Sequence, residues 1–256
     1  MAVLLIGCGR MGGALLRGWI GREEVAVVDP AAGEMEGVRR LSGIAEAASL
    51  PQPLEAVIAV KPQVLPGLLP ALKPLAEEGA LIVSIAAGAT LARLEEAVGA
   101  GAKLARAMPN TPAAVGRGVT ALIAAASLDS ADRARVAELF GWVGETLWLE
   151  REDQMDAVTA LSGSGPAYFF RFAEALARAG AEQDLAPDLA MKLARATLIG
   201  AGALAEAREE ELEALRTEVT SPGGTTAAAL AMLEDKLDAL VGSSVAAAAA
   251  RSRELG

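Results

Sequence analysis

The chain has 256 residues, of which 53% are hydrophobic and only 3% aromatic, and its formal net charge is −10. This length suits one large domain or two modest ones, and the acidic balance argues against nucleic acid or an anionic membrane as a partner, because both need a basic surface. The sequence contains no histidine, which excludes Ser-His-Asp chemistry and the usual zinc sites, so we expect no metal.

No segment of the sequence is typical of membrane insertion or export. No apolar run reaches the length of a membrane span, and residues 1–6 begin a strand with no basic leader or cleavage site. The single cysteine, Cys8, cannot form a disulfide within the chain, which fits a reducing compartment. We therefore expect a soluble cytoplasmic protein.

The first strand, turn and helix form the pattern of a dinucleotide-binding loop. Residues 2–6 are an apolar run of strand length, and a helical pattern follows the turn. Gly7 permits a tight turn, Gly9 lets the backbone approach phosphates, and Gly12 lets the helix pack closely on the strand. Free N–H groups of the first helical turn would then point at the anion. The alternative is a glycine-rich turn that binds nothing. The expected phosphate loop comprises Gly7, Gly9, Arg10, Met11 and Gly12.

An acidic residue follows the second expected strand, at residues 25–28. Asp29 closes this strand at about the spacing from the glycine loop that a ribose ligand requires. The glycine loop and Asp29 together favour a bound dinucleotide over an empty turn.

Strand-like and helix-like segments alternate through residues 30–150. Further strands are expected at 56–60, 80–85, 103–108, 119–124 and 146–149, the last two at sheet edges. Helices are expected weakly at 37–41, at 62–75 (kinked or split by Pro66 and Pro70), from a Thr90 cap to Val98, and at 132–143. This alternation predicts an α/β domain over 1–150 with a mostly parallel, doubly wound sheet.

The pattern changes near residue 150 and is helical from there to the end. Helices are expected at 153–179, 187–210 and 211–218, with two more after Gly223 and Gly224. Their small apolar faces suit close packing, either within the chain or against a second subunit. We expect an all-α second domain over 151–256.

Polar or small residues follow several of the expected strands. Lys61 follows one strand and could offer charge to a ribose or phosphate, although an ordinary exposed lysine is equally compatible with its position. Ala86 follows another strand, where small residues leave room for a nicotinamide. Asn110 and Thr111 lie between two prolines and could direct hydrogen bonds into a cleft or cap a loop. Ligands of open α/β sheets lie outside these strand ends.

Two stretches of the helical half combine glycines with hydroxyl side chains. In residues 220–226, the glycines free the backbone and Thr225 and Thr226 begin a helix, so that hydroxyl and N–H groups form a nest suited to a carboxylate. In residues 161–168, glycines inside a helix permit close approach of a ligand or of another helix, and Tyr168 is a possible donor.

These stretches together resemble the pyrroline-5-carboxylate reductase family, which makes proline in its last biosynthetic step. The match runs in order through the whole chain, and its last two motifs are the specific ones, because the first is shared with many dehydrogenases. The matching stretches are Gly7 to Gly12, Val60-Lys61-Pro62, Ser84 to Gly88, Met108 to Pro112, Leu161 to Tyr168, and Thr220 to Thr226.

The resemblance implies an N-terminal Rossmann domain followed by a helical dimerisation domain, with dimers that often assemble into rings of five. It also implies a site. Its expected substrate-binding residues are Ser221, Gly224, Thr225, Thr226 and Asn110, and Ala59, Lys61 and Ala86 would line the cofactor. Thr226 is the candidate catalytic residue, as donor to the ring nitrogen.

The implied reaction is hydride transfer from NADPH or NADH to 1-pyrroline-5-carboxylate, a cyclic imine that becomes proline. A protonated imine is already an electrophile, so positioning the two rings supplies most of the effect without a histidine. The family commonly uses NADPH. Here Asp29 would repel a 2′-phosphate, so we expect either cofactor to be usable and NADH to be less disfavoured than is usual, with Arg10, Arg39 or Arg40 compensating.

Two other functions remain possible from the residues. A 3-hydroxyacid dehydrogenase also joins a dinucleotide-binding half to a helical half, but it needs a catalytic lysine on the helix expected at 153–179, which contains none. A non-catalytic NAD(P)H sensor would bind the dinucleotide and lack the carboxylate nest.

Overall fold

The computed structural model describes residues 1–255, apart from the side chain of Asp235. The chain divides into two compact units. The first comprises residues 1–163 and the C-terminal residues from Ala248 on, and the second comprises residues 164–247. The domain boundary expected after residue 150 stays a prediction; residues 151–163 belong to the first unit.

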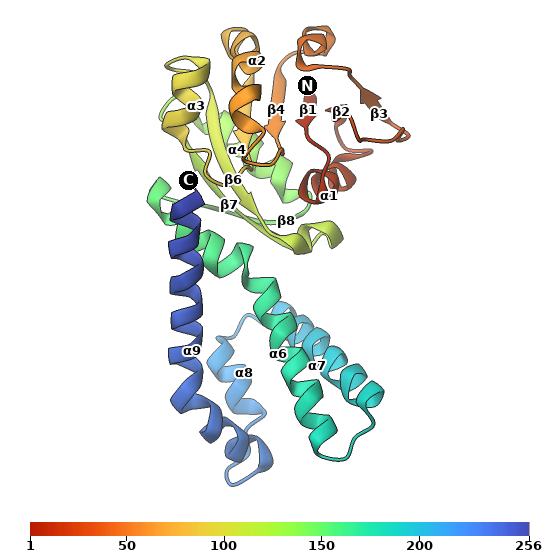
Figure 1. Ribbon diagram of the computed structural model, residues 1–256, viewed down its shortest axis with the longest axis vertical. Coiled ribbons are helices and arrows are strands. Elements are labelled where there is room, and N and C mark those ends of the chain that lie inside the picture. The colour runs from red at the N-terminus through yellow and green to blue at the C-terminus, as the bar shows by residue number, and fades with distance from the viewer. Residues whose placement is uncertain (256) are drawn as a thin grey trace. The chain divides into compact units, whose positions relative to one another are not determined.

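The first unit is built on one eight-stranded sheet (Figure 1). Its strand order is β3-β2-β1-β4-β5-β6-β7-β8, which is the doubly wound order expected. The strands are β1 (Ala2–Ile6), β2 (Glu24–Val28), β3 (Val38–Arg40), β4 (Leu54–Ile58), β5 (Leu81–Ser84), β6 (Leu104–Pro109), β7 (Gly118–Ala124) and β8 (Gly144–Trp148).

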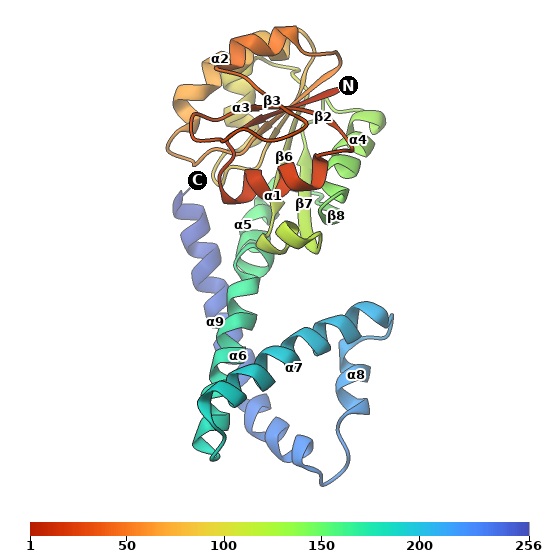
Figure 2. The same cartoon turned by 90° about the vertical axis from the view of Figure 1, so that its right-hand side faces the viewer.

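Two pairs of helices cover the two faces of the sheet (Figure 2). The helices are α1 (Arg10–Trp19), α2 (Leu65–Glu77), α3 (Leu91–Val98) and α4 (Ser130–Gly141). Leucines of α2 and α3 pack on one face, and Trp19 of α1 and Phe140 of α4 pack on the other. The strands between them are buried on both faces, which explains why β1 is a continuous apolar run rather than an alternating one.

Strands β1 to β6 run parallel, and β7 runs antiparallel to β6. The connection after Pro109 contains only a short 3₁₀ helix (Thr111–Val115), which is too short for the crossover that a parallel strand needs. β8 follows α4 and pairs parallel with β7. Of the two expected edge strands, β8 is therefore at an edge and β7 is not.

The helix expected at 37–41 is wrong, because residues 38–40 form strand β3. Gly37 adopts a φ of +76°, which lies outside the right-handed helical region, so no helix begins at this residue. Val38 then lies opposite Val25, and Arg40 lies opposite Val27. The strand is short and lies at the edge, so its sequence needs to match only one neighbour.

Helix α2 is continuous, so the split considered for residues 62–75 does not occur. Pro66 lies in its first turn, where an N–H would have no intrahelical acceptor. Pro70 and Pro74 lie inside the helix, whose buried face carries leucines at helical spacing: Leu65, Leu69, Leu72 and Leu75. Thr90 caps α3 as expected, its side chain accepting from the Arg93 N–H at 3.2 Å.

The helix expected at 153–179 is interrupted. A 3₁₀ turn (Glu152–Gln154), α5 (Met155–Val158) and a π-helical turn (Thr159–Gly163) precede α6 (Gly165–Glu182). The Thr159 hydroxyl donates to the Met155 carbonyl at 2.8 Å, and Pro166 lies in the first turn of α6, where it needs no N–H. The chain thus restarts its helix at the glycine-rich stretch.

The second unit is helical, as expected. Its helices α6 and α7 (Pro187–Ala207) lie side by side in both views, and α8 (Leu212–Glu218) follows. The two helices expected after Gly224 are a single helix, α9 (Thr225–Leu255). Its alanine-rich end is a strong helix former, so no break occurs before the C-terminal turns that belong to the first unit.

Candidate active site

The glycine loop joins β1 to α1 in a conformation that requires glycine. Gly7 has a φ of +94°, and a Cβ there would lie 2.8 Å from the Ala59 carbonyl oxygen. A Cβ on Gly12 would lie 2.3 Å from the Gly7 oxygen, so any side chain would push the helix off the strand. A Cβ on Gly9, by contrast, would meet no atom of the protein within 4 Å. The space beside Gly9 is open to a ligand.

Helix α1 presents its N-terminal amides to this open space. Its N-cap residue is Gly9, which has no side chain to satisfy them, and its first turn contains no acidic residue. The amides of Arg10 and Met11 therefore keep their hydrogen-bonding capacity for an anion. The loop fits a pyrophosphate by its open position and by these donors.

Asp29 follows β2 and lies beside the glycine loop. Its Oδ2 accepts the Cys8 N–H at 2.5 Å, and its Oδ1 accepts the Ala31 N–H at 2.7 Å. Together with burial of the thiol, the Asp29 charge raises the pKa of Cys8, while Arg17 lowers it; the net direction is upward. Cys8 is therefore a small residue in a crowded turn rather than a reactive thiolate.

The carboxyl ends of the neighbouring parallel strands bring the other cofactor candidates to the same edge. Ala59 follows β4, and its N–H donates to the Ile6 carbonyl at 2.7 Å. Lys61 is exposed, and its ammonium forms no ion pair with any residue of the described chain. Ala86 follows β5 and is only 4% exposed, because its methyl group packs in the core. Ala86 can meet a ligand only through its backbone.

Asn110 links three segments of the first unit. Its Oδ1 accepts the Val119 N–H at 2.9 Å, and its Nδ2 donates to the Ser162 carbonyl at 3.3 Å. The side chain is 8% exposed. These bonds hold the π-helical turn against the end of β6, so a direct contact between Asn110 and a substrate stays a prediction.

A pocket of about 330 Å³ lies beside the turn that follows β5. Arg106 of β6 is 6% exposed, and its Nη1 donates to Glu152 Oε1 at 2.6 Å. The same oxygen accepts the Leu91 N–H at 2.7 Å. On another wall, the Ser252 hydroxyl donates to Asp156 Oδ1 at 2.6 Å. Sequence reasoning missed these contacts, because 46 residues separate Arg106 from Glu152 and 96 separate Asp156 from Ser252.

The hydroxyl-rich stretch of the second unit forms a turn at the start of α9. Gly223 adopts a φ of +69°, and the Gly224 N–H donates to the Ser221 carbonyl at 2.9 Å. The hydroxyls of Ser221, Thr225 and Thr226 have no hydrogen-bond partner among residues 1–255. Hydroxyls and helix N-terminal amides thus gather at one turn, as a carboxylate site requires.

Among residues 1–255, no group of three or more histidine, cysteine, aspartate or glutamate side chains is arranged to hold a metal ion. No helix in that range is long and apolar enough to cross a membrane.

The sheet order and the glycine loop define a Rossmann-type oxidoreductase that binds NAD(P)H. Residues 2–88 match the family model described as NADP oxidoreductase, coenzyme F420-dependent. Residues 152–255 match the model described as pyrroline-5-carboxylate reductase dimerisation. The chain belongs to the pyrroline-5-carboxylate reductase family.

Individual relatives agree with this assignment. The chain is 38% identical to the pyrroline-5-carboxylate reductase of Synechocystis over 98% of its own length and 97% of the relative's. It is 43% identical to the Pseudomonas aeruginosa enzyme over 78% of its length and 73% of the relative's.

Solved structures of the family have the same fold. The pyrroline-5-carboxylate reductase of Coxiella burnetii superposes with a TM-score of 0.93 at 33% identity, over 99% of this chain and 98% of the other. The Plasmodium falciparum enzyme, solved with NADP bound, has a TM-score of 0.86 at 30% identity, over 100% of this chain and 98% of the other.

Proposed function

We propose that the chain reduces 1-pyrroline-5-carboxylate to L-proline with NADPH or NADH, the last step of proline biosynthesis. The observation that carries the proposal is the similarity to pyrroline-5-carboxylate reductases over almost the whole chain. The glycine loop and the Thr225 turn add an anion site in each unit, one suited to a pyrophosphate and the other to a carboxylate.

The residues of the first unit hold the dinucleotide. The amides after Gly9 bind the pyrophosphate, Asp29 lies beside the adenosine ribose, and the turn at Ala86 leaves room for the nicotinamide. The bound cofactor supplies a hydride to the imine carbon, and a proton on the ring nitrogen completes the amine. Lys61, exposed at the end of β4, offers a cation to the ribose or phosphate.

The turn before α9 holds the substrate. Ser221, Gly224 and Thr225 bind the carboxylate through hydroxyl and N–H groups, which fixes the ring. Thr226 donates a hydrogen bond to the ring nitrogen and relays a proton from water. A threonine hydroxyl is a weak acid, so its main contribution is to orient the ring: it donates to the nitrogen of the neutral imine and accepts from the N–H of the iminium.

We propose further that the protein forms dimers through its helical unit and acts in the cytoplasm. Large apolar side chains of α6 and α7 are exposed in the single chain, among them Phe169 and Ile199, each 64% exposed. Apolar surface of this extent is typical of a subunit interface. Assembly of the dimers into a ring of five follows the family resemblance.

A steady-state assay tests the reaction. The purified protein is given 1-pyrroline-5-carboxylate with NADPH or NADH, and cofactor oxidation and proline are measured together. The proposal predicts one proline per cofactor oxidised. A protein that binds both ligands without turnover would instead be a sensor, and turnover of a 3-hydroxyacid in place of the imine would favour the dehydrogenase alternative.

A further inference from the structure

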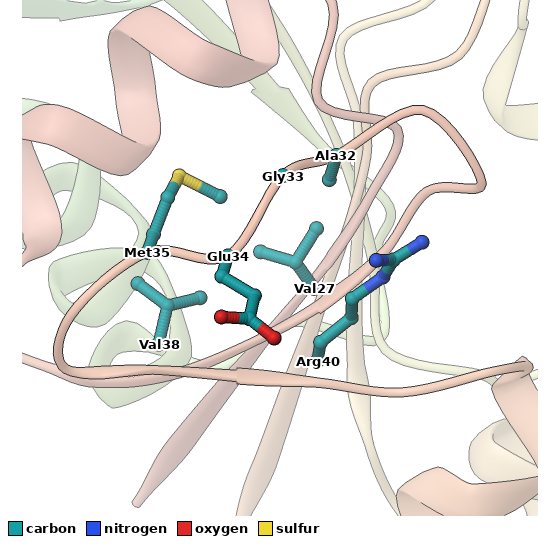
Figure 3. Close-up of a pocket in the computed structure, with 7 residues that line it drawn as sticks. All are labelled: Val27, Ala32, Gly33, Glu34, Met35, Val38 and Arg40. Atoms are coloured by element: carbon teal, nitrogen blue, oxygen red, sulfur yellow. The ribbon is translucent and has the colours of Figure 1, made fainter.

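A pocket at the end of β2 lies where the adenosine half of a dinucleotide is expected. It has a volume of about 250 Å³ and is lined by Val27, residues 32–35, Val38 and Arg40 (Figure 3). In doubly wound folds, residues at the end of the second strand meet the adenosine ribose. NADPH and NADH differ only by a 2′-phosphate on that ribose. The charges around this pocket therefore act on the one group that distinguishes the two cofactors.

The carboxylate of Asp29 is fixed between the glycine loop and the segment that leads into the lining residues 32–35. Each of its oxygens accepts one backbone N–H, from Cys8 at 2.5 Å and from Ala31 at 2.7 Å. Each oxygen keeps a further lone pair, which can accept a ribose hydroxyl. Because both oxygens are tethered, the side chain cannot turn away to make room for a phosphate.

Glu34 adds a second carboxylate, and it lines the pocket directly (Figure 3). The only cationic side chain among the lining residues is Arg40, whose Nη2 donates to the Pro30 carbonyl at 3.2 Å. Glu34 and Arg40 form no ion pair within the described chain, so both charges remain available to a ligand. The sum of the charges of Asp29, Glu34 and Arg40 is −1, which disfavours a dianionic phosphate.

The other two arginines considered from the sequence do not line this pocket. Arg39 points to the other face of β3, where its Nη2 donates to the Ser49 hydroxyl at 2.9 Å. Arg10 begins α1 and is absent from the residues that surround the pocket. Successive side chains of a strand point to opposite faces, so Arg40 lines the pocket and Arg39 does not.

We infer that this pocket sets the cofactor preference: Asp29 and Glu34 disfavour the 2′-phosphate, Arg40 alone retains it, and the protein binds NADH more tightly than NADPH. The inference rests on the use of NAD(P)H in the proposed function. It does not depend on the imine substrate.

Calorimetric titration of the full-length protein with NADH and with NADPH tests the inference, without turnover. The variants are Glu34→Gln and Arg40→Gln. Each has a matched control outside the pocket, Glu36→Gln from the same loop and Arg39→Gln from the same strand. All four side chains are exposed, so folding should be unaffected, and circular dichroism checks this.

The wild-type protein is expected to bind NADH several-fold more tightly than NADPH. Glu34→Gln should tighten NADPH binding about fivefold, and Arg40→Gln should weaken it about tenfold, with NADH changed less than about twofold. The controls should leave the ratio of the two dissociation constants unchanged. Tighter wild-type binding of NADPH, or a ratio that neither pocket variant moves, would overturn the inference. Absence of proline formation beside the expected binding pattern would count only against the proposed reaction.

Discussion

At the scale of single residues, Gly9 and Gly12 share one loop but meet different requirements. A Cβ on Gly12 would lie 2.3 Å from the Gly7 oxygen, whereas a Cβ on Gly9 would meet no atom of the protein within 4 Å. Gly12 therefore serves the packing of α1 on β1. Gly9 serves the ligand, because the space that its Cβ would occupy is empty in the protein without a cofactor.

This difference predicts opposite phenotypes for two alanine variants. Gly9→Ala should leave the Tm within about 2 °C of wild type, since an exposed change of this kind costs little, but it should weaken NADH and NADPH binding at least tenfold. Gly12→Ala should lower the Tm by several degrees, because the backbone must shift. Differential scanning calorimetry and cofactor titration measure the two effects. A Gly9→Ala protein that binds the cofactor normally would contradict the placement of the pyrophosphate.

The role of Thr226 is tested by a pair of substitutions. Thr226→Ala removes the hydroxyl and should lower kcat/KM for the imine by about 100-fold, because the ring nitrogen loses the hydrogen bond that positions it. Thr226→Ser keeps the hydroxyl and should stay within a few-fold of wild type. Steady-state kinetics at saturating cofactor measures both. Equal losses in the two variants would mean that the methyl group, and not the hydroxyl, matters.

The sequence predicted the residues whose chemistry depends on local spacing. Gly7, Gly12 and Asp29 were found because strand, turn and helix follow one another within the chain. The sequence does not place Glu34 and Arg40 in one pocket, because it predicts a helix at 37–41 and the face on which each arginine lies depends on β3. Only the strand shows which of two adjacent arginines meets a ligand.

At the scale of elements, α4 is tied to the sheet by a cluster of charged side chains. Arg135 donates to Glu55 of β4 and to Glu23, both through two hydrogen bonds, and its side chain is 13% exposed. The Glu55 side chain is 4% exposed, so Arg135 supplies its carboxylate with the hydrogen bonds that water would otherwise make. The arrangement is bidentate and mostly desolvated, which makes loss of either member costly.

Arg135→Met is expected to destabilise the protein by about 3 kcal/mol, because the buried carboxylate of Glu55 and the half-buried carboxylate of Glu23 lose their counter-charge. Lys73→Met is the control: Lys73 pairs with Glu77 across exposed positions on α2, and loss of this pair should cost less than about 0.5 kcal/mol. Urea denaturation measures both free energies of unfolding. Similar small losses in the two variants would show that the cluster adds little to stability.

The same cluster predicts a pH dependence of stability. Burial raises the pKa of Glu23, but hydrogen bonds from Arg135 and Trp142 outweigh burial, so the pKa lies below its ordinary value of 4.5. A depressed folded-state pKa means that the stabilisation is complete above pH 4.5 and is lost as the pH falls through the folded-state value. Urea midpoints measured from pH 6 downward should therefore fall more steeply for wild type than for Glu23→Gln. Parallel curves would exclude this contribution.

Element types were predicted where periodicity was strong and missed where tertiary context decided them. β1 and α7 were read correctly from a continuous apolar run and from a proline at the first helical position. β3 was missed because three residues carry too little pattern to compete with a helix. The π-helical turn before α6 (Thr159–Gly163) is not predicted, because five residues of such a turn leave no distinct period in the hydrophobic pattern.

At the scale of the whole molecule, the family's dimerisation region coincides with helices that expose large apolar side chains. Phe170 of α6 and Leu193 of α7 are 58% and 49% exposed in the single chain. A second subunit would remove such groups from water, at about 25 cal/mol per Å² of apolar surface. The sequence predicts that the region from residue 152 on is helical. It does not predict which apolar side chains remain exposed, because that depends on how α6 and α7 pack against each other.

Sedimentation equilibrium is expected to give an even number of subunits for the wild-type protein. Phe170→Glu should shift it toward monomer, because burial of an unpaired carboxylate opposes association. Val115→Glu changes a residue that is also exposed, at 77%, but lies in the first unit, and it should leave the mass unchanged. A wild-type monomer, or a monomer produced equally by both variants, would contradict dimerisation through α6.

Isotope labelling of the transferred hydrogen tests whether the protein makes proline by hydride transfer to the imine carbon. The protein is incubated with 1-pyrroline-5-carboxylate and a reduced cofactor that carries deuterium at C4 of the nicotinamide on the transferred side, and the proline formed is examined by NMR. We expect one deuterium on the methylene carbon bonded to the ring nitrogen, because that carbon is the imine carbon of the substrate. Absence of proline, or proline without deuterium at that carbon, would contradict it.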